Sequence, residues 1–189
     1  WDSLALYRQR AVIQAAEAKT LAAVGEDIGE ANETKEKVDF NKATLTEADR
    51  KIEVGSNGVI TIPAVATSKP TESTGKIIFM ESNLGGKQLH YSRTGEPQDF
   101  AYTFDTPAAG TYLLTARVVT PSWKQHLTLK INGADAPVDI ALPFTVGMWD
   151  QTEPVEVTLQ KGRNVLSFSR DHERLKGLTI RDLTLTPVK

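Results

Sequence analysis

Three consecutive runs of alternating apolar residues, between Glu96 and Asn132, constrain the fold of this chain more than any other stretch. In each run apolar side chains recur at every second position, which places them on one face of a β-strand. The runs are Phe100–Phe104, Tyr112–Val119 and His126–Ile131. Proline and glycine in Pro107–Gly110 separate the first two runs and supply a turn. The stretch therefore predicts antiparallel strands that bury one face.

Seven further runs extend this pattern to both sides. They are Val59–Ile62, Lys76–Glu81, Gln88–Ser92, Val138–Leu142, Glu153–Gln160, Val165–Phe168 and Leu178–Leu185. Turn residues such as Asn132-Gly133 separate the runs at near-regular intervals, with no helical periodicity between them. Short strands spaced in this way are typical of a sandwich or barrel. We therefore predict a mostly β protein whose residues 53–189 form an antiparallel β-sandwich of the jelly-roll type.

The first 52 residues differ from the rest in composition. Neither glycine nor proline occurs in Leu4–Val24, where alanine is frequent, and alanine has the strongest helix propensity. The sequence therefore predicts an N-terminal α-helical arm or linker over residues 1–52. Thr46 and Asp49 also resemble a capping box that begins a short helix, Glu47–Ile52. Two roles stay open for the arm, a linker or brace and an oligomerisation helix.

Composition argues against several kinds of partner and chemistry. The chain has 189 residues and a formal net charge of -2, which argues against nucleic acid or an anionic membrane surface as its partner. No run approaches the ~18 apolar residues of a membrane span. The lack of cysteine excludes disulfides and thiolate sites. Because the chain begins at Trp1 without a methionine or a signal-like segment, we expect it to be part of a longer protein.

Sequence motifs of the common catalytic types do not occur in this chain. GxSxG, HExxH and a phosphate-binding glycine loop are absent. The three histidines, His90, His126 and His172, lack the spacing of paired metal ligands. Carboxylate pairs occur at residues 153–156 and 171–173, where solvated charges are commonplace. We therefore predict no catalytic residue and no metal ligand.

Two tryptophans in predicted loops are the strongest candidates for ligand contact. Trp123 lies between two predicted strands, and Trp149 lies just before another. A tryptophan at the rim of a sandwich can stack on the apolar face of a sugar ring, while neighbours such as Lys124 and Asp150 bond its hydroxyls. Tyr91, at a strand end, is a further candidate. The alternative is that each tryptophan plugs the core or anchors its loop, and exposure of the rings distinguishes the two.

Six segments, in order, resemble the carbohydrate-binding modules of families 6 and 35, which are galactose-binding-like jelly rolls. The segments are Gln98–Phe100, Pro107–Tyr112, Leu127–Gly133, Val146–Trp149, Leu159–Leu166 and Gly177–Pro187. The resemblance covers about residues 58–187. It implies a non-catalytic module that binds a polysaccharide or oligosaccharide, and it makes Trp149 the inherited ligand contact.

The resemblance is incomplete at the calcium-binding and sugar-binding positions of these families. Members commonly carry acids near the first strand that help to hold a structural calcium, whereas Val59–Ile62 contains none. The acid of the closing strand would fall at Arg181 or, with a slip of one residue, at Asp182. A cation at Arg181 cannot ligate calcium. Thr179 stands near the position of a sugar-contacting asparagine. We therefore expect no cofactor.

The expected function is that of an accessory domain in a larger secreted protein, extracellular or periplasmic. Its expected partners are a polysaccharide or oligosaccharide and a neighbouring domain of the same polypeptide, which could hold a catalytic site. The alternative is a structural or assembly module that braces a neighbouring domain or subunit without binding sugar. The missing calcium acids favour this alternative.

Overall fold

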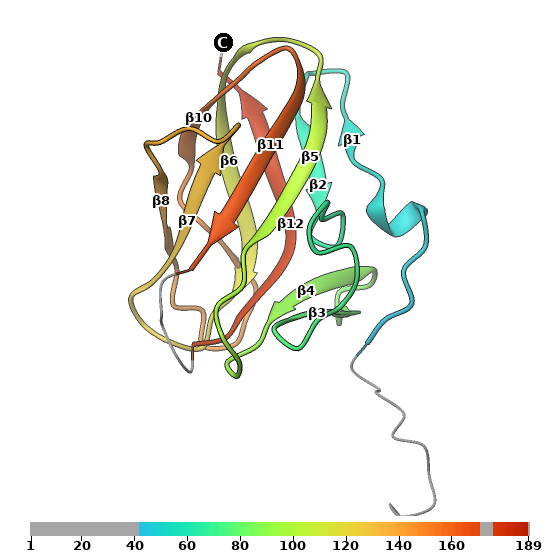
Figure 1. The fold of residues 1–189 in the computed structure, drawn as a ribbon, viewed down its shortest axis with the longest axis vertical. Helices are drawn as coiled ribbons and strands as arrows, with labels where there is room; N and C mark the ends of the chain where they lie inside the picture. The colour runs from blue at the N-terminus through green and yellow to red at the C-terminus, as the bar shows by residue number, and fades with distance from the viewer. Residues whose placement is uncertain (1–41, 171–175, 189) are drawn as a thin grey trace, which may run out of the picture. The chain divides into compact units, whose positions relative to one another are not determined.

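The computed structural model describes residues 42–170 and 176–188, which form two antiparallel β-sheets and one short 3-10 helix (Figure 1). The larger sheet contains β1 (Glu53–Val54), β2 (Ile60–Pro63), β3 (Ile77–Glu81), β4 (Lys87–Tyr91), β6 (Gly110–Val119), β9 (Asp150–Gln151), β10 (Val155–Leu159) and β12 (Leu178–Pro187). The smaller sheet contains β5 (Phe100–Thr106), β7 (Gln125–Ile131), β8 (Val138–Leu142) and β11 (Gly162–Ser169).

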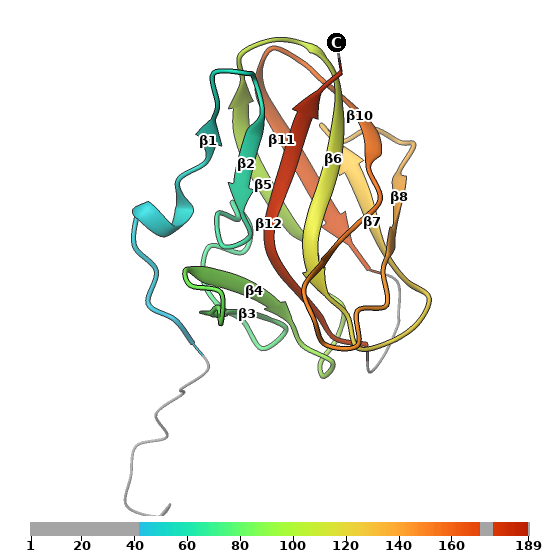
Figure 2. The same cartoon turned by 180° about the vertical axis from the view of Figure 1, so that it is seen from behind.

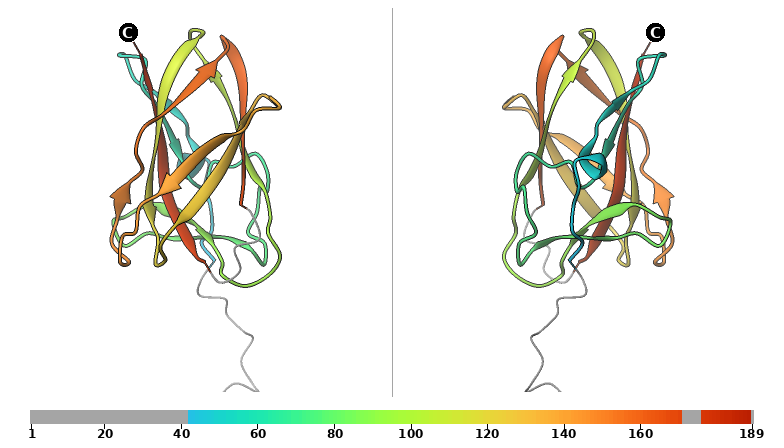
Figure 3. Two further views of the ribbon diagram at one scale, coloured as in Figure 1. Left: turned by 90° about the vertical axis from the view of Figure 1, so that its left-hand side faces the viewer. Right: turned by 90° about the vertical axis from the view of Figure 1, so that its right-hand side faces the viewer.

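The prediction of a mostly β, antiparallel sandwich is confirmed. The two sheets lie as layers with the core between them (Figure 3). All ten predicted strands overlap observed strands, and β1 and β9, with two residues each, are too short to show periodicity. Most of the predicted helical arm lies outside the described residues. No helix in the described part of the chain is long and apolar enough to cross a membrane.

β12 organises the larger sheet, because three other strands pair with it (Figure 2). On one side of β12, β6 pairs with it along most of the length of β12. On the other side, its first residues pair with β4 and its later residues pair with β2. On the far side of β6 lie β10 and β9. The strand order of the smaller sheet is β5-β11-β7-β8.

A bulge interrupts β12 where its partner changes. Its buried residues are Leu178, Ile180, Leu183 and Leu185, so the spacing widens from two residues to three in the middle. The register with β6 shifts at the same place, between Ile180 and Asp182. Two consecutive residues, Arg181 and Asp182, thus fall between core positions. β-Bulges often re-aim side chains next to binding sites.

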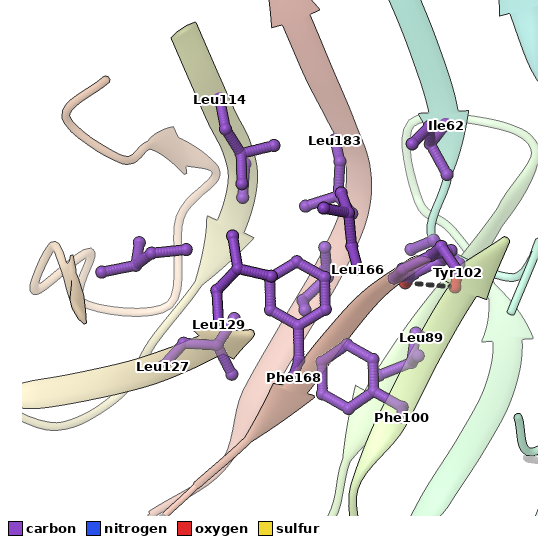
Figure 4. Packing of buried hydrophobic residues seen from close by; sticks show 14 of the residues in the cluster. Ile62, Leu89, Phe100, Tyr102, Leu114, Leu127, Leu129, Leu166, Phe168 and Leu183 are labelled. Carbon is purple, nitrogen blue, oxygen red and sulfur yellow. Dashed lines mark hydrogen bonds between the residues drawn. The ribbon is translucent and has the colours of Figure 1, made fainter. Parts of the chain in front are cut away.

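Aromatic rings fill the centre of the core (Figure 4). Phe100 and Phe168 stack with ring centroids 5.2 Å apart, and Tyr102 meets Phe168 edge-on at 5.8 Å. The Tyr102 hydroxyl donates a hydrogen bond to the carbonyl oxygen of Ala64 at 2.9 Å, which satisfies its buried polar atom. The alternating residues of the first predicted strands are therefore the core, as their periodicity indicates.

Residues 42–52, which the sequence places in the arm, lie against the sandwich. The reciprocal hydrogen bonds of the predicted capping box are present, because the backbone N–H of Thr46 donates to Asp49 Oδ2 at 2.8 Å and Thr46 Oγ1 accepts from the Asp49 N–H at 3.4 Å. The N-cap residue of the helix is nevertheless Glu47, one residue later than the prediction. The short helix is a single 3-10 turn, η1 (Ala48–Arg50), rather than Glu47–Ile52. Ile52 packs against the core cluster, which anchors this segment.

Candidate functional site

A polar pocket of about 350 Å³ lies on the outer face of the larger sheet, because its lining residue Arg117 alternates with the buried Ala116 and Val118 of β6. Its lining residues are Arg117, Trp149, Asp150, Gln151 and Asp182. The strand register explains why they meet: Asp182 of β12 is opposite Arg117 of β6, and Arg117 is opposite Gln151 of β9. Three neighbouring strands thus contribute polar side chains, two from β9 and one each from β6 and β12. The bulge in β12 supplies the carboxylate.

Trp149 forms the aromatic wall of this pocket, at the end of the loop that joins β8 to β9. The ring is partly buried, and its Nε1–H donates a hydrogen bond to Asn83 Oδ1 at 2.9 Å. Asn83 belongs to the turn between β3 and β4. Arg181 holds that turn by donating to Ser82 Oγ at 2.8 Å and to the carbonyl of Gly85. The indole is therefore oriented from outside the core and does not plug it.

The polar groups of the pocket offer both donors and acceptors. Arg117 is exposed and lines the pocket, so its guanidinium can donate N–H groups to a ligand. Gln151 donates from Nε2 to Thr115 Oγ1 at 2.7 Å, and the Asp150 carboxylate accepts the Gln151 backbone N–H at 2.8 Å. An aromatic wall beside such groups is suited to a ligand with one apolar face and several hydroxyls.

Burial raises the pKa of the Asp182 carboxyl above its usual value of 3.8, although the cations of Arg181 and Arg117 act against this shift. The ionised carboxylate is the better acceptor for a ligand hydroxyl. We expect the affinity for a sugar to fall as the pH is lowered through this raised pKa. The loss should begin at a higher pH than it would for an aspartate with the usual pKa. Titration calorimetry at several pH values measures this, and Asp182→Asn should abolish the pH dependence.

The stability of the fold should depend on Asp182 in the opposite sense. A carboxyl whose pKa is raised by folding binds its proton more tightly in the native state. Its contribution to the free energy of unfolding is therefore greatest at low pH and is lost as the pH rises through the folded pKa. Asp105→Asn, an exposed position of β5 in the smaller sheet that does not line the pocket, is the control and should leave the affinity and its pH dependence unchanged. Parallel changes of affinity and stability with pH would contradict this role for Asp182.

Trp123 and Lys124 lie outside the pocket, in the loop between β6 and β7. The Trp123 side chain is 69% exposed, and its ring stacks on Phe144 with centroids 4.0 Å apart and planes 24° from parallel. Lys124 is exposed and has a positive φ of 53°. The structure thus brings Trp149 and Asp150 together, and it places Trp123 and Lys124 on the neighbouring loop.

Val146 occupies a strained position in the β8–β9 loop. Its φ is 53°, a left-handed value that costs a non-glycine residue roughly 1–2 kcal/mol, and its side chain is 74% exposed. Val146→Gly removes this strain but adds about 0.5–1 kcal/mol of backbone entropy cost. We expect a net gain of about 0.5–1 kcal/mol in the free energy of unfolding, measured by urea denaturation. The matched variant Gly147→Ala, at φ 86°, should lower stability, and a stabilising effect there would contradict this assignment.

Tyr91 is a core residue and offers no surface to a ligand. Its side chain is 3% exposed, and its hydroxyl oxygen accepts the backbone N–H of Gln98 at 3.0 Å. Two cations contact the ring, with Lys76 Nζ 4.8 Å and Arg170 Cζ 5.2 Å from its centroid. Burial raises the pKa of its hydroxyl. Of the five candidate residues from the sequence, Tyr91 is therefore the one that is enclosed.

The calcium that the family resemblance implies does not fit the residues present. No group of three or more histidine, aspartate or glutamate side chains suited to a metal occurs in residues 42–170 and 176–188. The guanidinium of Arg181 occupies the space beside the β3–β4 turn, where it bonds Ser82 and Gly85. A cation site cannot be built around a fixed positive charge.

Four residues that build or orient the pocket were not predicted as ligand contacts, namely Asn83, Arg117, Gln151 and Asp182, the last of which the sequence suggested only as a calcium-ligand position. Arg117 lies at an outward position of an alternating strand, so the periodicity of that strand already placed its side chain on the sheet surface. The widened spacing between Ile180 and Leu183 marked the bulge that presents Asp182. The other two residues carry no comparable signal, because they reach the pocket through a turn and a two-residue strand.

No family model matches this chain, and no curated protein matches it by sequence. Solved structures do match. A family 35 carbohydrate-binding module from Clostridium thermocellum superposes with a TM-score of 0.56 at 15% identity, over 69% of this chain and 98% of that one. A family 6 module of Cellvibrio mixtus lichenase 5A, in complex with cellotriose, gives 0.51 at 19% identity, over 68% of this chain and 97% of that one.

The same fold occurs in a protein with another role. The mosquito-larvicidal Cry4Aa toxin from Bacillus thuringiensis matches with a TM-score of 0.55 at 17% identity, over 68% of this chain and 23% of that one. At these identities the similarity defines the fold. The described part of the chain therefore has the fold of carbohydrate-binding modules of families 6 and 35.

Proposed function

We propose that this chain contains a non-catalytic carbohydrate-binding module that holds a glycan in the pocket walled by Trp149. The observation that carries the proposal is an oriented indole beside Arg117, Gln151 and Asp182 on one face of the sheet. A pyranose ring would stack on the indole while its hydroxyls bond these polar groups. The fold of the solved modules supports the proposal, although a fold alone does not fix a function.

The ligand that fits the pocket best is an uncharged sugar. The two carboxylates of the pocket, Asp150 and Asp182, are matched by the guanidinium groups of Arg117 and of Arg181, whose Nε lies 3.8 Å from Asp182 Oδ2. The pocket therefore has no excess of positive charge to attract an acidic glycan. The guanidinium donates and the carboxylates accept, which matches the dual character of a hydroxyl. A shallow site of this size binds weakly, because little area is buried. An accessory domain of this kind would hold a catalytic neighbour on a polysaccharide in an extracellular setting.

Affinity electrophoresis tests the proposal with uncharged polysaccharides. The chain would be run through native gels that contain hydroxyethylcellulose, laminarin, galactomannan or dextran, with alginate as an acidic comparison. We expect slower migration in at least one uncharged glycan and none in alginate, relative to a gel without polysaccharide. Unchanged migration in every gel would overturn the proposal.

A structural or assembly role is the second candidate, and the exposed apolar side chains of one loop favour it. Val146 and Met148 are 74% and 73% exposed, and the stacked ring of Trp123 lies nearby. Exposed apolar clusters often mark protein contacts. Light scattering after gel filtration distinguishes the two: a concentration-dependent dimer without glycan binding would support the assembly role.

A further inference from the structure

We propose that the stacked pair of Trp123 and Phe144 is a second sugar-stacking platform, which holds a further unit of the same glycan chain. The module would then bind an internal stretch of a polysaccharide rather than a single sugar. This inference rests on the proposed function of the Trp149 pocket. It adds a distinct surface, because neither Trp123 nor Phe144 lines that pocket.

The first argument is the geometry of the pair. With centroids 4.0 Å apart and planes 24° from parallel, Phe144 covers one face of the Trp123 ring. The tryptophan is nevertheless 69% exposed, so its remaining surface faces solvent. A ring that plugs the core would be enclosed instead. A flat, exposed indole that a second ring supports can bind the apolar face of a pyranose with little loss of rotamer freedom.

The second argument is that the two loops of the platform are fixed to each other. The backbone N–H of Thr120 donates to Thr145 Oγ1 at 2.9 Å, and the Thr145 N–H donates to the carbonyl of Thr120 at 3.2 Å. Thr120 also bonds the carbonyl of Pro143 through its hydroxyl. Both threonines are buried, so these bonds are shielded from water. The platform is therefore ordered before a ligand arrives.

The third argument is continuity with the pocket, which commits the platform to one occupant. Phe144 and Trp149 belong to the same loop and are five residues apart, so their Cα atoms are separated by at most about 18 Å. A turn shortens this distance, because the Met148 N–H donates to the carbonyl of Thr145 at 2.9 Å. A glycan of a few units is long enough to span this distance.

Two linked contacts give an affinity that depends on chain length. Once one sugar is bound in the pocket, contact with the platform is intramolecular and costs less entropy. Short oligosaccharides reach the pocket alone, whereas longer ones reach both surfaces. Loss of the Trp123 ring should weaken binding of long oligosaccharides about fivefold or more, with little effect on short ones.

The test is titration calorimetry with oligosaccharides from the disaccharide to the hexasaccharide, taken from the polysaccharide that retards the wild type. Wild type is compared with Trp123→Ala, Trp123→Phe and the double variant Val146→Ala/Met148→Ala. We expect affinity to rise with length in the wild type, to lose that rise in Trp123→Ala and to recover it largely in Trp123→Phe. The double variant keeps the ring but removes exposed apolar area, so it should bind as the wild type does.

Proton NMR of the indole N–H groups gives an independent result. The Trp123 signal, identified by its loss in Trp123→Phe, should shift with the hexasaccharide and not with the disaccharide. Equal affinities of wild type and Trp123→Ala at every length would overturn the platform and leave the pocket in place. Binding of no oligosaccharide by the wild type would overturn both. A wild-type dimer that Trp123→Ala dissociates, with glycan affinity unchanged, would assign the surface to a second copy of the chain.

Discussion

Replacing Trp149 with alanine is expected to abolish retardation by the polysaccharide that the wild-type chain binds. The substitution removes the aromatic wall of the pocket and leaves Arg117 and Asp182 without the apolar surface that positions a sugar ring. Truncating a central aromatic residue of a binding site typically costs about 2 kcal/mol or more, which is roughly a thirtyfold loss of affinity. Affinity electrophoresis and titration calorimetry measure this loss directly.

Two further variants separate the ring of Trp149 from its hydrogen bond. Trp149→Phe keeps an aromatic face but loses the Nε1–H donor, and Asn83→Ala removes the acceptor. We expect both to bind more weakly than the wild type and more tightly than Trp149→Ala. All three should unfold near the wild-type midpoint, because the ring lies outside the core cluster. Full affinity in Trp149→Ala would exclude the pocket as the glycan site.

Replacing Phe168 with alanine should lower the free energy of unfolding by about 3–5 kcal/mol. The ring is fully buried, stacks on Phe100 at 5.2 Å and meets Tyr102 at 5.8 Å, so its removal leaves a cavity between both sheets. For a chain of this size the melting temperature should fall by roughly 10 °C. Urea denaturation followed by circular dichroism measures the change.

The control for Phe168 is Leu84→Ala in the turn between β3 and β4. The Leu84 side chain is 48% exposed and belongs to no core cluster, so its loss should change stability by less than about 0.5 kcal/mol. If Leu84→Ala and Phe168→Ala lowered the free energy of unfolding by similar amounts, the aromatic centre would not be the main source of stability.

Periodicity alone predicted most of the sandwich, because one face of each strand is buried. Phe100, Tyr102 and Phe104, which alternate in the sequence, are all buried in the structure. The same rule assigns Tyr91 to the core, since it alternates with the buried Leu89. Its position at a strand end suggested a rim instead, and the periodicity was the better guide.

The candidate site was less predictable, because it depends on the register between strands that are distant in sequence. Asp182, Arg117 and Gln151 become neighbours only when β12, β6 and β9 pair. Local patterns identified Trp149 because it ends a loop with turn residues, and Asp150 because it directly follows as the first residue of β9. These patterns carried no information on β12, where a one-residue bulge decides that Asp182 points outward into the pocket.

The change of partner along β12 links binding to local unfolding. The β3–β4 hairpin is joined to β12 over Leu178–Ile180, a short contact compared with that of β6. Its turn carries Asn83, the partner of Trp149, and is tied back by Arg181. Opening this hairpin would release the indole, so the apparent affinity of the pocket includes the equilibrium between closed and open hairpin. A ligand that stacks on Trp149 would in turn slow hydrogen exchange in β3 and β4.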